Sequence, residues 1–268
     1  MCYTYSCYTR GEVSIPIIRL PKALRLKQIK KTGQRDRKAL IIIPAYNEAD
    51  SIGEVISSIR AAVDDADIVV INDGSTDNTA EVVRELNTAV ISHPCNMGIG
   101  ATMQTGYRYA ASRKYQIAIQ VDADGQHPPD QINRIIQPLI EGTSDVAIGS
   151  RFIGKSTYTP SVARKIGILI FARVISLIVG KRFTDTTSGF RAANREVINF
   201  YAAYYPEDYP EVEALILLHK AGFTITELPV TMKVRTGGTS SITSGRAVYY
   251  MIKVLLAISI DLIKKVER

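Results

Sequence analysis

Residues 39–72 read ALIIIPAYNEADSIGEVISSIRAAVDDADIVVIN and alternate two short apolar runs with one amphipathic segment. The continuous apolar run Ala39–Ala45 is typical of a buried strand, and Asp67–Asn72 is a second strand of the same kind. Between them, the capping-box pattern of residues 51–54 predicts a helix to about Val63. A strand, a helix and a strand of these lengths predict one βαβ unit, in which the two strands are parallel.

The same alternation continues to residue 150. Further strands are predicted at Ala89–Ser92, Tyr115–Val121 and Asp145–Gly149, and further helices at about 77–87, 100–112 and 128–141. Beyond residue 150 we expect a helix at Val162–Val179, a turn-rich stretch at 184–191, a helix around 211–220, a strand at 224–234 and an apolar helical segment at 246–265. The pattern predicts an α/β fold with a doubly wound, mostly parallel sheet and helices on both faces. Ligands bind such sheets outside the carboxyl ends of their strands.

The composition is that of a globular protein. Of the 268 residues, 46% are hydrophobic and 22% are charged, which excludes a disordered or fibrous chain. The three cysteines, Cys2, Cys7 and Cys95, are too few for a disulfide framework and read as free thiols. No signal peptide and no uncharged run of transmembrane length is visible, so we expect the protein in the cytosol or on the cytosolic face of a membrane.

The net charge of +7 is unevenly distributed along the chain. Residues 1–38 contain ten basic and two acidic side chains, a charge of +8, and the remaining 230 residues sum to −1. A basic arm of this kind can bind an anionic membrane or a nucleic acid. Taken alone, it allows a non-catalytic membrane-binding or nucleic-acid-binding module as one hypothesis.

Two carboxylates directly follow the predicted strand Tyr115–Val121. Asp122 and Asp124 therefore lie on the ligand-binding edge of the sheet, where two carboxylates can hold a hard divalent cation. Gln126 and His127 can add a ligand or a contact to a substrate. The alternative is an ordinary Asp- and Gly-rich turn. The similar triplet Asp65-Ala-Asp67 precedes a strand, so we interpret it as a solvated turn at the opposite edge.

Three more polar loops follow predicted strands, namely PAYNE (44–48), DGSTD (73–77) and GSR (149–151). An Asp in this position can accept hydrogen bonds from a ribose or a base, and a Tyr can stack on the base. The stretch Asn96-x-Gly98-x-Gly100 precedes a helix and can be an anion site or a plain loop-to-helix turn. No GxGxxG follows the first strand and no P-loop occurs, which disfavours dinucleotide-binding and P-loop proteins.

These motifs together resemble a known family. IIIPAYNE (41–48), VINDGSTD (70–77), DADGQH (122–127), GSR (149–151) and DTTSGFR (185–191) occur in the order and spacing of family 2 inverting glycosyltransferases with the GT-A fold. VEALILLHKAGFTITELPV (212–230) and RTGGTSSI (235–242) resemble the dolichyl- and polyprenyl-phosphate sugar transferases. The resemblance covers about residues 39–265.

The resemblance implies a donor site and a metal site. Pro44, Ala45, Tyr46, Glu48 and Asp73 would bind the nucleoside of a UDP- or GDP-sugar. Mg²⁺ or Mn²⁺ would be held against the diphosphate by Asp122, Asp124 and Gln126. The implied activity is metal-dependent, inverting transfer of the sugar to a polyprenyl or dolichyl phosphate at the cytosolic membrane face.

The acceptor side of the implied site depends on the chemistry of the acceptor. A phosphate is already ionised near neutral pH and needs cations and hydrogen-bond donors to position it. The candidates for this role are Arg151, Arg164, Ser188, Arg191, Arg235 and Ser240. The residues predicted to be catalytic are Asp124, Glu213, Arg151 and Arg235.

A saccharide hydroxyl is the alternative acceptor and would need a general base. Glu213 matches the family's acidic position, with Glu211 and Asp208 as neighbouring alternatives. Two positions depart from the lipid-phosphate pattern, Ile168 where some members have Ser and Ser241 where several have Lys. Both departures remove phosphate contacts.

The predicted organisation has three parts. Residues 1–38 form the basic arm, residues 39–242 form the GT-A domain with an amphipathic helix at about 162–180, and residues 243–268 form a C-terminal amphipathic helix. Basic residues at the ends of both late helices favour helices that lie in the membrane interface. The alternative is packing on the domain or an oligomer contact. The predicted partners are a membrane surface, a separate small membrane protein and a second copy of the chain, with no nucleic acid expected.

Overall fold

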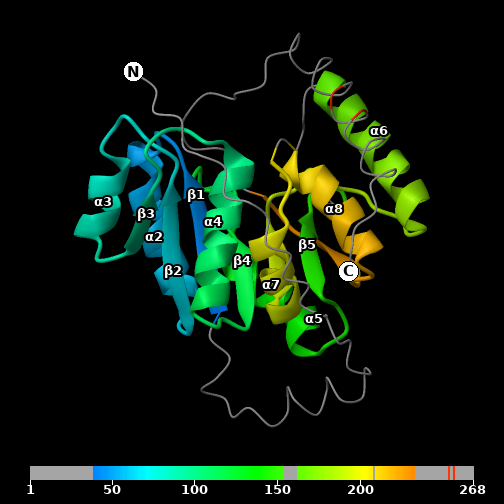
Figure 1. Ribbon diagram of the computed structural model, residues 1–268, viewed down its shortest axis with the longest axis horizontal. Helices are drawn as coiled ribbons and strands as arrows, with labels where there is room; N and C mark the ends of the chain where they lie inside the picture. The colour runs from blue at the N-terminus through cyan, green and yellow to red at the C-terminus, as the bar shows by residue number, and fades with distance from the viewer. Residues whose placement is uncertain (1–38, 154–161, 208, 233–252, 254–255, 257–268) are drawn as a thin grey trace, which may run out of the picture.

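The computed structural model describes residues 39–153, 162–207 and 209–232, together with Lys253 and Leu256 (Figure 1). The predicted basic arm at 1–38 lies outside these residues, as do Asp208, Arg235 and Ser240. Of the predicted C-terminal helix at 243–268, only Lys253 and Leu256 are described.

A seven-stranded sheet forms the centre of the molecule. Its strands are β1 (Ala39–Ala45), β2 (Ala66–Asn72), β3 (Ala89–Ser92), β4 (Ile117–Gln120), β5 (Val146–Ser150), β6 (Arg191–Asn194) and β7 (Ile225–Pro229). They lie in the order β3-β2-β1-β4-β6-β5-β7. β6 is antiparallel to both its neighbours and the other pairs are parallel, which confirms the predicted mostly parallel α/β sheet.

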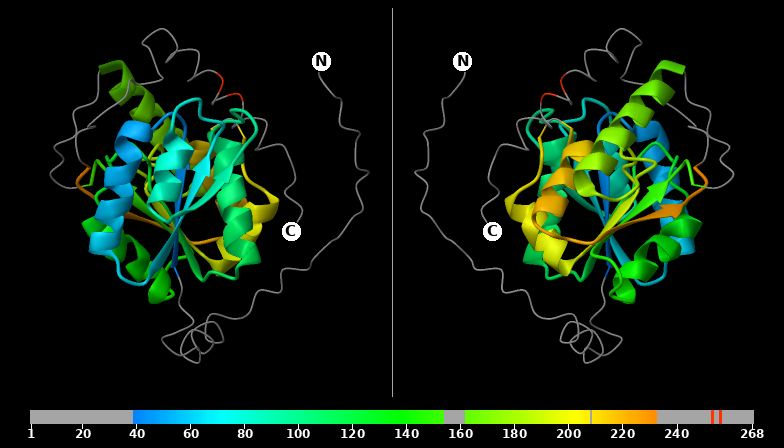
Figure 2. Two further views of the ribbon diagram at one scale, coloured as in Figure 1. Left: turned by 90° about the vertical axis from the view of Figure 1, so that its left-hand side faces the viewer. Right: turned by 90° about the vertical axis from the view of Figure 1, so that its right-hand side faces the viewer.

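Helices cover both faces of this sheet (Figures 1 and 2). They are α2 (Ala49–Ala62), α3 (Thr79–Glu85), α4 (Ile99–Ser112), η2 (Pro129–Gln131), α5 (Ile132–Ile140), α6 (Val162–Val179), α7 (Arg195–Ala203) and α8 (Pro210–Lys220). One core cluster joins the sheet to α2, α3 and α5, and a second joins it to α4, α6, α7 and α8.

Strand β1 shows why the apolar runs become central strands. Leu40 and Ile42 belong to the α4 side of the core, and Ile41 and Ile43 belong to the α2 side. Because successive strand residues point to opposite faces, a strand between two helical layers needs apolar residues at every position. Each of these four side chains is at most 1% exposed, and full burial of one contributes about 1.5–3 kcal/mol.

The observed elements differ from the prediction in two instructive places. Helix α2 begins at Ala49 rather than in the capping box at 51–54, because Asp77 of the neighbouring loop accepts the Ala49 backbone N–H at 3.1 Å. Strand β6 and helix α7 were not predicted. The RAAN sequence of β6 carries no strand signal of its own, and the strand forms by pairing between β4 and β5.

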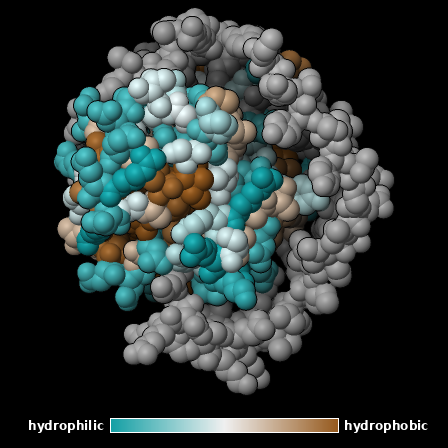
Figure 3. Space-filling model, turned by 60° about the vertical axis from the view of Figure 1, so that its left-hand side comes forward, coloured by the Kyte–Doolittle hydropathy of each residue, from teal (hydrophilic) through white to brown (hydrophobic). Residues whose placement is uncertain are grey.

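Helix α6 has the predicted bounds Val162–Val179 and packs beside α8 (Figure 1). Ile168, Phe171 and Ile175 are buried, whereas Leu169 and Leu177 are exposed. Within the described residues, none of the helices combines the length and hydropathy needed to cross a membrane. On the face shown in Figure 3 the described surface is largely hydrophilic, with a smaller hydrophobic patch near its middle.

Candidate functional site

A cleft of about 420 Å³ opens at the carboxyl ends of β1, β2 and β4. Seven residues predicted from the sequence line it: Pro44, Ala45, Tyr46, Glu48, Asp73, Asp122 and Asp124. Loops that are up to 80 residues apart in the chain therefore meet in one cleft. This agrees with the expectation that ligands bind such sheets outside the carboxyl ends of the strands.

Sequence reasoning missed three cleft residues. Ile99 and Thr102 come from the first turns of α4, and Gln120 is the last residue of β4. The signal for Gln120 was a polar side chain inside the apolar run YQIAIQV. Ile99 and Thr102 lie on the face of α4 that borders the cleft. Which face of a helix borders a cleft depends on how the helix packs in the fold, so the sequence alone did not indicate them.

Two loops on the predicted nucleoside side are tied together by hydrogen bonds. Asn47 donates its backbone N–H to Ser75 Oγ at 2.9 Å and accepts the Thr76 backbone N–H on Oδ1 at 2.8 Å. Glu48 donates its backbone N–H to Thr79 Oγ1 at 2.9 Å. These contacts hold the loop that carries the exposed Tyr46 ring against the loop after β2.

Asp77 strengthens the same junction. Burial raises the pKa of its carboxyl, but hydrogen bonds from the Thr79 hydroxyl and from the backbone N–H groups of Ala49 and Thr79 outweigh burial and lower the pKa below its ordinary value. Asp77 is therefore an ionised cap for α2 at neutral pH.

Asp73 is buried and shapes one wall of the cleft. Its carboxylate accepts the backbone N–H groups of Met97 and Gly98, both at 2.9 Å, and contacts His93 Nδ1 at 2.8 Å. Gly74 has a φ of +68°, and a Cβ there would lie 2.4 Å from the carbonyl carbon of Cys95. Asp73 thus fixes the loop that precedes α4.

Asp122 and Asp124 lie in a tight turn after β4. The Asp122 side chain is 38% exposed and accepts a hydrogen bond from Gln120 Nε2 at 3.2 Å. Asp124 Oδ1 accepts the backbone N–H of Gln126 at 3.0 Å, and Gly125 between them has a φ of +74°. Gln126 is in the same turn, but it does not line the cleft.

The donor atoms present at this turn fit a hard divalent cation. Within the described parts of the chain, no cluster of three or more His, Cys, Asp or Glu side chains is arranged to hold a metal. Two carboxylates alone suit Mg²⁺ or Mn²⁺, because such an ion keeps several waters and takes further oxygens from substrate phosphates. Asp122 and Asp124 would hold the ion.

Two buried arginines order the DTTSGFR loop, and Arg151 also joins it to the GSR loop. Arg151 forms a bidentate ion pair with Asp185 at 2.6 and 2.7 Å and also donates to Thr187 Oγ1 at 2.8 Å. Arg191 donates to the backbone carbonyls of Ser188 at 2.7 Å and Thr186 at 2.9 Å. These contacts order the loop.

Three of the predicted acceptor residues lie close together, and the side chains of the other three are outside the described residues. Arg151, Ser188 and Arg191 are buried in this loop network, and their role toward an acceptor stays a prediction. Arg164 belongs to α6, but its side chain lies outside the described residues, like Arg235 and Ser240.

Helix α8 brings a carboxylate to the cleft, and it is Glu211. Residues two apart on a helix point in different directions, and Glu213 is buried and does not line the cleft. Burial raises the pKa of Glu211, and the nearby Arg191 charge opposes that rise. Glu211, the neighbouring alternative to Glu213, therefore has the geometry of a cleft residue.

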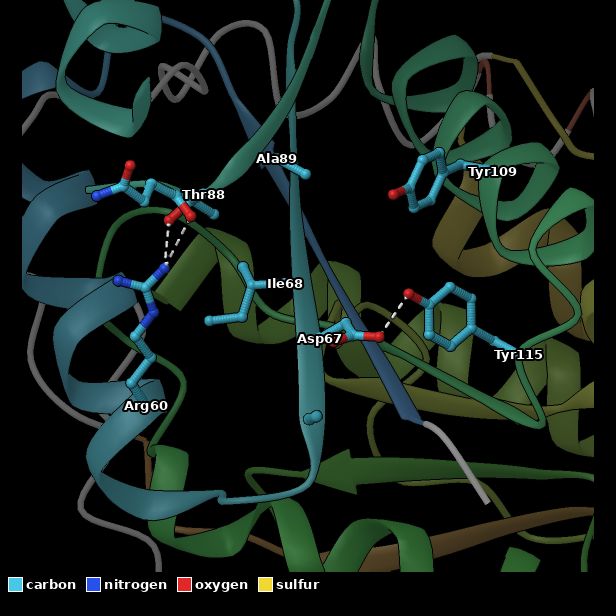
Figure 4. Close-up of a pocket in the computed structure, with 9 residues that line it drawn as sticks. Arg60, Asp67, Ile68, Thr88, Ala89, Tyr109 and Tyr115 are labelled. Atoms are coloured by element: carbon cyan, nitrogen blue, oxygen red, sulfur yellow. Dashed lines mark hydrogen bonds between the residues drawn. The ribbon is translucent and has the colours of Figure 1, made fainter. Parts of the chain in front are cut away.

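A second hollow of about 400 Å³ lies at the opposite edge of the sheet (Figure 4). Tyr115 donates its hydroxyl to Asp67 Oδ2 at 2.7 Å there, and Arg60 donates to Thr88 Oγ1 at 2.9 Å. Asp65 and Asp67 are both exposed at the start of β2, in agreement with the predicted turn at the N-terminal edge.

The sequence of this chain is similar to those of several known proteins. The sequence profile of glycosyl transferase family 2 matches residues 40–201, which is more than half of the chain. The UDP-N-acetylglucosamine–dolichyl-phosphate N-acetylglucosaminyltransferase of Methanococcus voltae is 32% identical over 73% of this chain and 85% of its own length. The polyprenol monophosphomannose synthase of Mycolicibacterium smegmatis is 28% identical over 83% of this chain and 88% of its own length.

A solved structure shares the fold. Glucosyl-3-phosphoglycerate synthase from Mycobacterium tuberculosis, crystallised with Mn²⁺, UDP and phosphoglyceric acid, superposes with a TM-score of 0.65 at 21% identity. The superposition covers 87% of this chain and 80% of that chain. The likeness establishes the GT-A type of α/β fold.

Proposed function

Because the chain belongs to glycosyl transferase family 2, we propose that it transfers a sugar from a nucleotide sugar to a polyprenyl or dolichyl phosphate. The observation that carries this proposal is one cleft lined both by the loop after β1 and by Asp122 and Asp124 after β4. Relatives that act on dolichyl or polyprenol phosphates support the choice of acceptor.

The donor would lie along this cleft. The Tyr46 ring, which is exposed, would stack on the base, and the loop fixed by Asp73 would line another part of the donor site. Asp122 and Asp124 would hold Mg²⁺ or Mn²⁺ against the diphosphate. When bound, such an ion neutralises the charge that develops on the leaving diphosphate.

The acceptor would attack from the opposite face of the sugar and invert the anomeric centre. A lipid phosphate is ionised near neutral pH, so it needs positioning rather than a base. The arginines of the GSR and DTTSGFR loops, with Arg164 and Arg235, are proposed to supply that positive charge. Glu211 in the cleft favours the alternative acceptor, a saccharide hydroxyl, which needs a base.

The exposed side of α6 supports attachment to the membrane surface. Leu169 is 52% exposed and Leu177 is 83% exposed, and Lys165 and Arg173 are exposed on the same helix. Apolar and basic residues on one helix suit the interface of an anionic membrane. After α6 the chain reaches the carboxyl end of β5, where the Thr184 hydroxyl contacts the Ser150 hydroxyl at 2.7 Å. We propose that α6 and the basic arm dock the cleft at the cytosolic face.

The linkage in the product tests this proposal. The purified protein is incubated with Mn²⁺ and labelled UDP- or GDP-sugars, in parallel with polyprenyl phosphate and with an oligosaccharide as acceptor. We expect label in a lipid product that mild acid releases, because a sugar linked through a phosphodiester is labile. An acid-stable glycoside formed from a saccharide acceptor would support the hydroxyl alternative and contradict the lipid-phosphate proposal.

A further inference from the structure

His127 follows the metal loop and is 5% exposed. Its Nδ1 accepts the backbone N–H of Asp122 at 2.9 Å, and its Nε2 lies 3.4 Å from Asp122 Oδ2. A ring nitrogen that accepts a hydrogen bond carries no proton. With Nδ1 as the acceptor, the ring N–H is on Nε2, the nitrogen that lies 3.4 Å from Asp122 Oδ2.

The position of the His127 ring is fixed from its other side. The ring stacks on Phe190 with centroids 5.0 Å apart and an angle of 29° between the planes. Phe190 is fully buried and belongs to the loop that Arg151 and Arg191 order. The ring thus connects the metal loop after β4 to the loop before β6.

Two further groups confine the Asp122 carboxylate. Gln120 Nε2 donates to Oδ1 at 3.2 Å. A Cβ on Gly189 would lie 3.2 Å from both carboxylate oxygens and 2.8 Å from Gln120 Nε2, so the bare backbone of Gly189 lies directly against them. The carboxylate has neighbours on several sides, and His127 Nε2 is the ring nitrogen near Oδ2, at 3.4 Å.

We propose that His127 is a positioning residue for the divalent cation, and that its Nε2–H orients the Asp122 carboxylate toward the cleft. This inference rests on the proposed function, because it needs Asp122 to be a ligand of the cation. Groups that orient the ligands of a metal typically change its affinity by about 10–100-fold when they are removed.

Two substitutions separate the two contacts of the ring. In His127→Asn the amide oxygen can replace Nδ1 as acceptor of the Asp122 backbone N–H, but no donor remains at the position of Nε2. In His127→Gln the amide nitrogen can replace Nε2 as donor, but the backbone acceptor is lost. Binding of Mn²⁺ is followed by the EPR signal of the free ion, with whichever of UDP and GDP stabilises the wild type present at saturation.

We expect His127→Asn to raise the dissociation constant of Mn²⁺ by about 10–100-fold and His127→Gln to stay closer to the wild type. Nucleotide binding without metal should be unchanged in both, which also checks their folding. Phe190→Leu, which removes the stacked ring and keeps both nitrogens, should weaken Mn²⁺ binding as well. Tyr115→Phe at the opposite edge is the control and should leave it unchanged.

The opposite order, with Mn²⁺ bound normally by His127→Asn and weakly by His127→Gln, would overturn the proposal in favour of the backbone contact. Normal Mn²⁺ binding by all the variants would overturn it too, while leaving the proposed function intact. A wild type that binds its nucleotide but no Mn²⁺ would overturn both.

Discussion

Glu211 and Glu213 are two residues apart on α8, and only Glu211 lines the cleft. A carboxylate in the cleft can act as the base that a hydroxyl acceptor needs, whereas an ionised phosphate needs no base. Burial raises the pKa of Glu211, so an active base at this position would lose activity as the pH falls through that raised pKa. The two acceptor chemistries therefore predict different pH profiles.

Glu211→Gln tests this difference. With a lipid phosphate as acceptor, we expect the variant to keep transfer within about tenfold of the wild type and to show the same pH profile, because general base catalysis supplies about 10²–10⁴-fold only where it is used. Initial rates between pH 5 and 9 measure it. Glu213→Gln is the matched comparison on the same helix. A loss of two or more orders of magnitude, together with loss of the acid limb in Glu211→Gln alone, would indicate a hydroxyl acceptor.

At the scale of elements, the packing of helices on the sheet depends on a few small residues. A Cβ on Gly106 of α4 would lie 2.4 Å from Cγ2 of Ile42, which is fully buried in β1. A Cβ on Gly53 of α2 would meet its nearest neighbour, Val82 Cγ1, at an ordinary 3.6 Å. Gly106 therefore allows α4 to pack closely on β1, whereas the position of Gly53 has room for a larger side chain.

We expect Gly106→Ala to lower the free energy of unfolding by about 1–3 kcal/mol because it overpacks the core. Gly53→Ala should raise it by up to about 1 kcal/mol because alanine favours the helix. Thermal melting of the two variants and the wild type shows whether each substitution raises or lowers the stability. If Gly106→Ala were as stable as Gly53→Ala, α4 would be able to move away from β1 without loss of stability.

Helix α6 supports a second prediction at this scale. Replacing Leu169 and Leu177 by Glu should weaken binding to anionic vesicles by at least about tenfold, since the burial of each leucine contributes up to about 1.5–3 kcal/mol. Tyr204→Glu, on another exposed apolar side chain, is the control. Vesicle co-sedimentation reports the binding, and nucleotide binding should not change. Unaltered co-sedimentation of the double variant would remove α6 from the membrane contact.

Across the whole molecule, the accuracy of the sequence prediction followed the local strength of its signals. Strand β1 was predicted to the residue, because a wholly apolar run between polar loops has few alternatives. Strand β6 was missed, because Arg-Ala-Ala-Asn becomes a strand only through its neighbours β4 and β5. In the cleft, motif residues at strand ends were found, whereas Ile99 and Thr102 depended on the orientation of a helix.

The acceptor side illustrates what a sequence leaves open. The charge of the arginines in the GSR and DTTSGFR loops predicts phosphate ligands. Their partners could not be read from the sequence, because the Asp185 that pairs with Arg151 at 2.6 Å is 34 residues away in the chain. Charge alone does not tell a residue that binds the substrate from one that orders a loop.

We propose metal-assisted transfer of a sugar to a lipid phosphate in the cleft between Tyr46 and Asp124. The most direct measurement compares the wild type with Asp124→Asn for transfer of labelled sugar to polyprenyl phosphate in the presence of Mn²⁺. We expect an acid-labile lipid-linked sugar from the wild type and a loss of at least about 100-fold in the variant, as for removal of other groups that stabilise developing charge. Full transfer activity in Asp124→Asn, with Mn²⁺ dependence unchanged, would contradict it.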